Sequence, residues 1–175
     1  SGNTALGAII GATVGGVAGA VIGRQMDKQA EEMKKNIPDA TVERVGEGII
    51  VEFNSKILFA FDKSTLSSDA RVNLNKLISI LNKYPDTNIE VQGHTDDVGT
   101  AHYNMALSRR RASAVSSYLS SNGIASSRLT TKGFGESANK VSNSTEDGQA
   151  QNRRVEFLIT ANEKMKAAAA KEAGK

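Results

Sequence analysis

Short stretches of alternating apolar and polar residues predict β-strands in the part of the chain after residue 40. In Asn88–Gly93 two aliphatic residues alternate with Glu90 and Gln92, a pattern typical of a strand with one covered face and one solvated face. Similar patterns predict further strands over Lys56–Phe61, Leu129–Phe134 and Arg154–Thr160, and a hairpin of two strands over Thr41–Phe53.

Two longer segments carry apolar residues at helical spacing. In the first, aliphatic residues recur three or four positions apart from Leu74 to Leu81, as on the buried face of an α-helix. Ser67 can cap its first turn, and the helix must end before Pro85. The second helix is predicted over Thr100–Asn122, because its last residue and the following glycine form a typical left-handed helix end.

After the hairpin, these elements follow the order strand, helix, strand, helix, strand, strand. Several strands place polar residues on one face, so we expect the helices to cover only the other face. The sequence therefore predicts an α+β fold: a two-layer sandwich with a mixed sheet and helices on one face, preceded by a Gly-rich helical segment.

The N-terminal segment has a different composition. The run from Ala5 to Gly23 is uncharged, and in a helix it would extend about 28 Å at about 1.5 Å per residue. A glycine at every fourth position would form a stripe on which a second helix could pack closely. We expect this segment to associate with a membrane or to self-associate, and a flexible Gly/Ala linker is the alternative. The stripe consists of Gly7, Gly11, Gly15, Gly19 and Gly23.

The composition divides the chain into four parts. We predict a glycine-zipper, membrane-associated segment over 1–24, a charged and solvated connector over 25–40, a globular domain over 41–161, and an Ala/Lys-rich tail over 162–175. The apolar run lacks the basic region that opens a secretory signal peptide, so it does not resemble one. From the start at Ser1 we expect that an earlier signal has been removed.

Overall composition narrows the possible functions. The net charge of +3 is too small to indicate nucleic-acid binding, and the absence of cysteine excludes thiol catalysis and iron–sulfur clusters. His94, Asp96, Asp97 and His102 do not form a recognised metal-ligand motif. No nucleophile elbow or phosphate-binding loop is present. We predict no enzymatic activity, no metal and no cofactor.

The stretch Gly93–Leu119 is the most informative, because it joins a strand end, a loop with two adjacent carboxylates and an Arg-rich helix. Arg111 lies midway between two aliphatic residues four positions away on either side, and therefore on the packing face of the helix. An unpaired charge there would be strongly destabilising. Asp96 or Asp97 in the preceding loop is the expected partner.

Thr95 and Asn104 belong to the same loop and the same helix side, so a small polar pocket with both signs of charge can form. A carboxylate suits an ammonium group, and a planar guanidinium binds a carboxylate through two hydrogen bonds. Such a pocket fits a zwitterionic amino-acid head group. The alternative is an internal salt bridge between Asp96 and Arg111 with no ligand.

Two other positions could contribute to this pocket. Asp62 closes a predicted apolar strand, where it could line the same crevice or cap a turn. Arg153 and Arg154 open the last predicted strand, and alternation sends their side chains to opposite faces. One of the two could therefore reach the pocket, and we expect the other at the surface.

Several ordered motifs between residues 56 and 160 resemble the peptidoglycan-binding OmpA-like C-terminal domain. This module, of order βαβαββ, also occurs in peptidoglycan-associated lipoproteins and flagellar stator B subunits. With its glycine repeat, the chain further resembles glycine-zipper outer-membrane lipoproteins of the YiaD type. The motifs are Phe61-Asp62 with Leu66, Gly93-His94-Thr95-Asp96, Gly99, Tyr103-Asn104, Leu107-Ser108, Arg111-Ala112, Gly133-Phe134-Gly135-Glu136 and Asn152-Arg153-Arg154-Val155-Glu156.

The resemblance implies non-catalytic binding of peptidoglycan through the diaminopimelate residue of its stem peptide. In this reading Asp96 and Arg111 grip the free amino and carboxylate groups of that residue. The other positions that match the family are Thr95, Asn104 and Leu107 in the pocket, and Asp62 and Arg153 in its motifs.

The resemblance also implies a location at the periplasmic side of a Gram-negative outer membrane. The N-terminal segment or an upstream lipid would attach the protein to this membrane, and the domain would tether it to the cell wall. The alternative is a structural envelope protein that forms homo-oligomers through the glycine stripe and binds no ligand.

Overall fold

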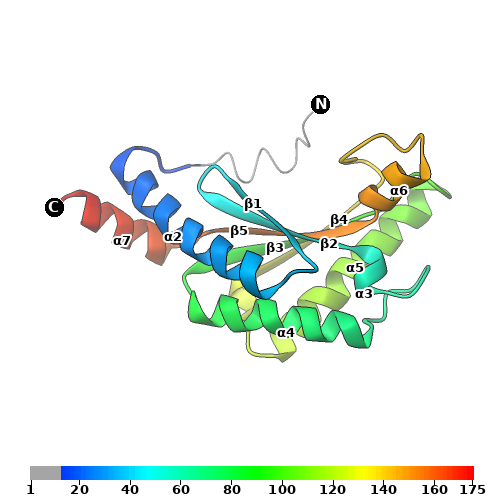
Figure 1. Cartoon of the computed structure of the whole chain (residues 1–175), viewed down its shortest axis with the longest axis horizontal. Helices are drawn as coiled ribbons and strands as arrows, with labels where there is room; N and C mark the ends of the chain where they lie inside the picture. The colour runs from blue at the N-terminus through cyan, green and yellow to red at the C-terminus, as the bar shows by residue number, and fades with distance from the viewer. Residues whose placement is uncertain (1–12) are drawn as a thin grey trace.

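A five-stranded sheet lies at the centre of the structure, a computed structural model in which residues 13–175 are described (Figure 1). Its order is β1-β2-β5-β3-β4; only β3 and β4 pair in parallel. The prediction of a mixed sheet is confirmed. The strands are β1 (Thr41–Val45), β2 (Gly48–Asn54), β3 (Thr87–His94), β4 (Leu129–Gly135) and β5 (Arg154–Ala161).

The α-helices of the described chain are α2 (Gly16–Asn36), α3 (Ser55–Leu58), α4 (Ser68–Lys83), α5 (Ala101–Ser121), α6 (Glu146–Asn152) and α7 (Glu163–Ala173), and a short 3-10 helix spans Ser126–Arg128. Both helices predicted in the globular domain are present as α4 and α5. The hydroxyl of Ser67 accepts a hydrogen bond from the amide of Ala70 at the start of α4. Gly123, with a φ of 101°, follows the end of α5. Local capping signals therefore located both helices correctly.

One hydrophobic core lies between the helices and one face of the sheet. Alternate residues of the central strands point into it, among them Val51, Val91 and Phe157, and they pack with side chains from α2, α4 and α5. This arrangement confirms the predicted two-layer α+β fold with helices on one face.

The strand predicted over 56–61 is wrong. The ladder between β2 and β5 ends at the pair Asn54–Arg154, and α3 begins directly after it. The Asn54 side chain accepts a hydrogen bond from the amide of Lys56, which caps this short helix. The predicted hairpin is present as β1 and β2, and β2 serves as the first strand of the βαβαββ order in place of the strand predicted after it.

The polar face of β3 is buried, contrary to the pattern in Asn88–Gly93, whereas Lys132 of the neighbouring edge strand β4 is exposed. Glu90, Gln92 and His94 of β3 are all buried. Gln92 and His94 pair with Glu156 and Arg154 of β5, and the Gln92 side-chain amide donates a hydrogen bond to the Glu90 carboxylate. The expectation that one of Arg153 and Arg154 lies at the surface is also wrong, because Arg154 pairs across the strands with buried polar neighbours.

The N-terminal glycine segment does not form one continuous helix. Gly15 and Gly16 have positive φ values of 76° and 61°, and α2 begins only at Gly16. Gly7 and Gly11 lie outside the described residues. A Cβ added at Gly19 would lie 2.5 Å from a carboxylate oxygen of Glu47 in the β1–β2 turn. The hairpin thus approaches α2 on the side that carries the glycines.

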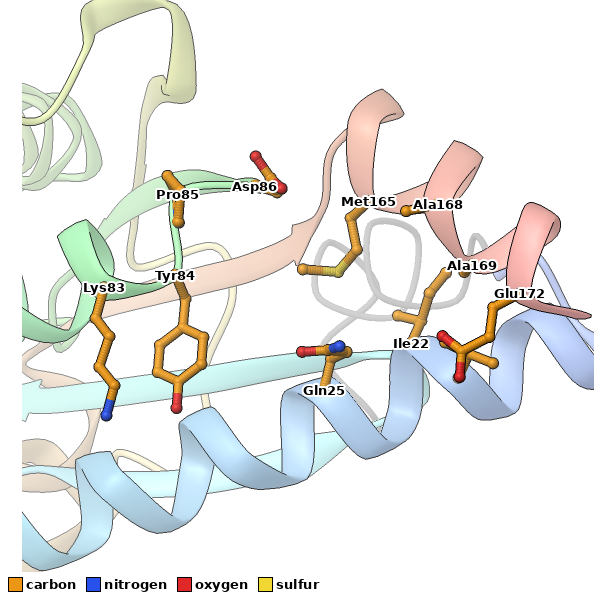
Figure 2. A pocket seen from close by; sticks show the side chains of 11 residues that line it. Ile22, Gln25, Lys83, Tyr84, Pro85, Asp86, Met165, Ala168, Ala169 and Glu172 are labelled. Carbon is orange, nitrogen blue, oxygen red and sulfur yellow. The ribbon is translucent and has the colours of Figure 1, made fainter.

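The connector predicted as solvated is the second half of α2. Its charged residues alternate with Met26, Ala30 and Met33, which are fully buried in the core. Helix α7, formed by the Ala/Lys-rich tail, packs against α2, and a cavity of about 160 Å³ separates the two helices from Pro85 (Figure 2). No helix of residues 13–175 has the length and apolar character needed to cross a bilayer.

Candidate functional site

A pocket of about 810 Å³ opens where β3 ends and α5 begins. Its other walls are the segment around α3, the loop that follows it, and α6. The structure brings together at this pocket all seven residues singled out in the sequence, which are Asp62, Thr95, Asp96, Asn104, Leu107, Arg111 and Arg153.

Close packing of α5 on the sheet positions the pocket. A Cβ at Gly93 would lie 2.2 Å from the backbone oxygen of Ser108, so only glycine permits this approach. The Ser108 hydroxyl also accepts a hydrogen bond from the amide of Gly135 at 2.9 Å. The helix backbone therefore lies directly on β3 and β4, which fixes Asn104, one turn before Ser108, in the wall of the pocket.

Asp96 forms an ion pair with Arg153, with 2.5 Å between Oδ2 and Nη1. Its other carboxylate oxygen accepts a hydrogen bond from the amide of Val98 at 3.0 Å. The expectation that Asp96 pairs with Arg111 is wrong. Because His94 pairs with Arg154 across the antiparallel β3–β5 ladder, the residues just beyond that pair lie next to each other.

Arg111 lines the same pocket but makes different contacts. Its Nε donates a hydrogen bond to the backbone oxygen of Lys63 at 2.8 Å, and its guanidinium lies 5.0 Å from the centre of the Phe59 ring. Burial lowers the pKa of Arg111, and the charge of Asp62 opposes this shift. Within residues 13–175 its terminal nitrogens have no hydrogen-bond partner, so they are available to a ligand.

Thr95 and Asn104 hold the loop that presents Asp96. The Thr95 hydroxyl donates to the backbone oxygen of Asp96 at 2.7 Å, and the Asn104 amide donates to the backbone oxygen of Val98 at 3.1 Å. Both side chains are buried, as is Leu107, which supplies an apolar part of the pocket wall. Thr95 and Asn104 therefore hold the backbone of the loop and, with it, the position of the Asp96 carboxylate.

Asp62 lies on the opposite wall, in a backbone conformation with φ of 60°. This is uncommon for a residue other than glycine, and such strain is concentrated at functional sites. The Tyr103 hydroxyl donates a hydrogen bond to the Asp62 carboxylate, which raises the pKa of Tyr103. Phe61 beside it is 95% exposed at the rim of the pocket.

Sequence reasoning missed part of this site. Tyr103 and Phe59 contact predicted residues, and α6 contributes Glu146 and Gln149 to the lining. Helix α6 had a local signal, because the Thr145 hydroxyl accepts a hydrogen bond from the amide of Gly148 and two acidic residues follow it. Phe59 was missed because it was assigned to a strand over 56–61 that does not form.

His94, which the sequence placed among possible metal ligands, takes no part in the pocket lining. Its ring stacks on Phe134 with the ring centres 5.1 Å apart, and its Nε2 lies 3.1 Å from the amide oxygen of Gln92. Burial, together with the nearby charge of Arg154, lowers the pKa of His94 to about 3. It is therefore a neutral side chain of the buried polar face at physiological pH.

The pocket combines a carboxylate that is held in place, that of Asp96, with the guanidinium of Arg111, whose terminal nitrogens have no partner among the described residues. These groups bind an ammonium and a carboxylate, respectively. The arrangement is suited to recognition of a zwitterionic head group.

The sequence of this chain is similar to those of known protein families and individual proteins. Residues 58–153 match the model of the OmpA family, and residues 1–30 match that of a glycine zipper. The chain is 38% identical over 120 residues to the probable lipoprotein YiaD of Escherichia coli K12, covering 69% of this chain and 55% of the relative. It is 31% identical over 136 residues to the peptidoglycan-associated lipoprotein of Brucella melitensis, covering 72% and 81%, respectively.

A solved structure of a putative MotB-like protein from Desulfovibrio vulgaris is also similar. Its TM-score is 0.75 at 26% identity, over 81% of this chain and 94% of that one. This likeness extends the similarity from sequence to the arrangement of the sheet and helices. The chain spans little more than half the length of the YiaD relative.

Proposed function

The chain belongs to the OmpA family, and from this premise we propose that it binds peptidoglycan without catalysis and tethers the outer membrane to the cell wall. The relative named a peptidoglycan-associated lipoprotein supports this function, because it shares the folded domain over most of its own length. The glycine-zipper match and the lipoprotein YiaD support attachment at the periplasmic side of the outer membrane.

The observation that carries the proposal is the presence of both charges in one pocket. Asp96 would bind the free ammonium of a diaminopimelate residue in the stem peptide, and Arg111 would bind its carboxylate. Leu107 and the ring of Phe59 offer apolar surface to the methylene groups between the two ends of that residue. Diaminopimelate matches the pocket in all three respects.

The strength of a single site is expected to be modest. Each charge-assisted hydrogen bond contributes about 1.5 to 3 kcal/mol, and the entropy lost on association offsets much of the sum. The cell wall presents the same group many times, so several membrane-attached copies would bind it through a high effective concentration. Many copies together would hold the wall strongly, although each copy binds and releases it reversibly.

The test is co-sedimentation of the full chain with purified sacculi that contain diaminopimelate. We expect Asp96→Ala and Arg111→Ala to reduce the pelleted fraction at least tenfold. Arg71→Ala is the matched control, because Arg71 is exposed on α4 and does not line the pocket. The full chain is required, since α2 supplies buried core residues such as Met26.

Circular dichroism would verify that each variant is folded. Equal pelleting of the wild type and both pocket variants would contradict the proposal. That result would instead favour a structural envelope protein that associates through its N-terminal segment.

A further inference from the structure

We propose that Arg153 is a latch that occupies Asp96 in the empty pocket and makes binding selective for ligands with both an ammonium and a carboxylate group. This inference rests on the proposed function, because it concerns the same pocket. The guanidinium of Arg153 stands where the ammonium of a ligand would bind. A ligand must therefore displace Arg153 before it can reach Asp96.

The two partners of this ion pair differ in their freedom to move. The Asp96 side chain is 10% exposed and is held by the amide of Val98, whereas the Arg153 side chain is 41% exposed. Within residues 13–175, the guanidinium of Arg153 makes a hydrogen bond only through Nη1, and that bond is the one to Asp96. Arg153 is thus the partner that can leave.

The backbone of Arg153 does not need to move when the side chain leaves. Its amide donates to the backbone oxygen of Gln149 at 3.1 Å, and its carbonyl accepts from the amide of Ser55 at 2.9 Å. Rotation of the side chain alone would release Asp96. Such a rotamer change is within reach of a half-exposed side chain on the nanosecond scale or faster.

The charges that line the pocket are balanced, with three acidic residues (Asp62, Asp96 and Glu146) and three basic residues (Lys56, Arg111 and Arg153). An amine without a carboxylate would take Asp96 and leave Arg153 unpaired beside Arg111. The two arginines already repel each other: after burial, the charges of Arg110 and Arg153 also lower the pKa of Arg111. Displacement by a simple amine is therefore unfavourable.

A zwitterion removes this penalty. Its ammonium replaces the guanidinium at Asp96, and its carboxylate lies between two arginines that would otherwise repel each other. The exchange keeps every charge paired. Arg153 therefore acts as a specificity-determining residue that rejects amines without a carboxylate.

The experiment measures binding of three probes to the full chain by NMR titration: meso-diaminopimelic acid, propylamine and propionate. For the wild type we expect binding of diaminopimelic acid and at least a hundredfold weaker binding of propylamine. In Arg153→Gln, Asp96 loses its internal partner, so we expect propylamine to bind at least tenfold more tightly than to the wild type. Arg71→Gln removes an exposed arginine from α4 and is the matched control.

The outcomes distinguish an Arg153 that controls selectivity from an Arg153 that only binds the ligand. A parallel loss of affinity for all probes in Arg153→Gln would overturn the latch, as would unchanged selectivity. If the wild type does not bind diaminopimelic acid, the proposed function itself fails. A thermal melt verifies folding, and Arg153→Lys, which keeps the charge, is expected to reject propylamine as the wild type does.

Discussion

Arg153 and Arg154 are neighbours in the chain but belong to two different regions of the molecule. Arg153 reaches into the ligand pocket with its side chain 41% exposed, and Arg154 lies in the buried polar face of the sheet with 1% exposed. Both form an ion pair with a carboxylate. Arg154 also donates to the backbone oxygens of Asn152 and Ala138, each at 3.1 Å, so three of its nitrogens are bonded.

The difference shows how one kind of ion pair serves two purposes. Burial and additional hydrogen bonds make the Arg154–Glu156 pair part of the folded framework, because either partner alone would be an uncompensated buried charge. In the Asp96–Arg153 pair the arginine is 41% exposed and bonded through one nitrogen, so it can move into solvent when another cation takes its place at Asp96. The Arg154–Glu156 pair fixes β5, whereas in the Asp96–Arg153 pair a ligand can replace the arginine.

The largest expected effect comes from breaking the buried pair. Glu156→Ala leaves Arg154 without its carboxylate, and we expect the free energy of unfolding to fall by about 3 to 5 kcal/mol. Urea denaturation measures this change. Glu43→Ala, at an exposed position of β1, is the control. A loss for Glu156→Ala no larger than that of the control would remove the distinction between the two regions.

The pH dependence of stability sharpens the comparison. The pKa of His94 is about 3 in the folded chain against an ordinary value of 6.5. Below pH 6.5 the unfolded chain binds a proton that the folded chain does not, so stability is lost as the pH falls from 6.5 towards 3. Between pH 7 and pH 5 this loss is about 2 kcal/mol.

His94→Gln should remove this loss from a series of urea denaturations between pH 7 and pH 5. The groups that face His94 are Gln92, Arg154 and Glu156, and burial raises the pKa of Glu156, which gives a pH dependence of the opposite sign. The comparison is therefore made between variants at each pH. His102→Gln, at an exposed position, should leave the wild-type slope unchanged; identical slopes in all three proteins would contradict the prediction.

The smallest effect is expected in the pocket. Asp96→Asn removes the charge of the exchangeable pair, and we expect the free energy of unfolding to change by less than about 1 kcal/mol. The same denaturation assay at low and at high salt checks this prediction. A loss as large as that of Glu156→Ala would show that the pocket pair is also part of the framework.

Local patterns located most elements because capping and periodicity act over short distances. Ser67 and Gly123 mark helix ends through their own side-chain and backbone geometry, and together with the spacing of apolar residues they predicted α4 and the end of α5. The site residues were found for a related reason, since most of them lie in one loop and on one face of one helix.

Features that depend on strand order were not predictable in this way. Nothing local to Asp96 indicates that β5 lies beside β3, and this neighbourhood selects Arg153 over Arg111 as its partner. The same pairing buries Glu90, whose alternation with aliphatic residues indicated a solvated face. In α2 the charged residues concealed the buried stripe that includes Met26 and Met33.

The first turn of α2 and the pocket lie at opposite ends of the domain, which matters if the protein is pulled. In Figure 1 the start of α2 and all of α7 lie at one end of the sheet, and α3 and α6, which line the pocket, lie at the other. Tension between the first turn of α2 and a polymer held in the pocket would therefore run along the length of the domain. The amides of Val14 and Gly15 donate hydrogen bonds to the Glu47 carboxylate, each at 2.9 Å, and these bonds would be among the first to carry the tension.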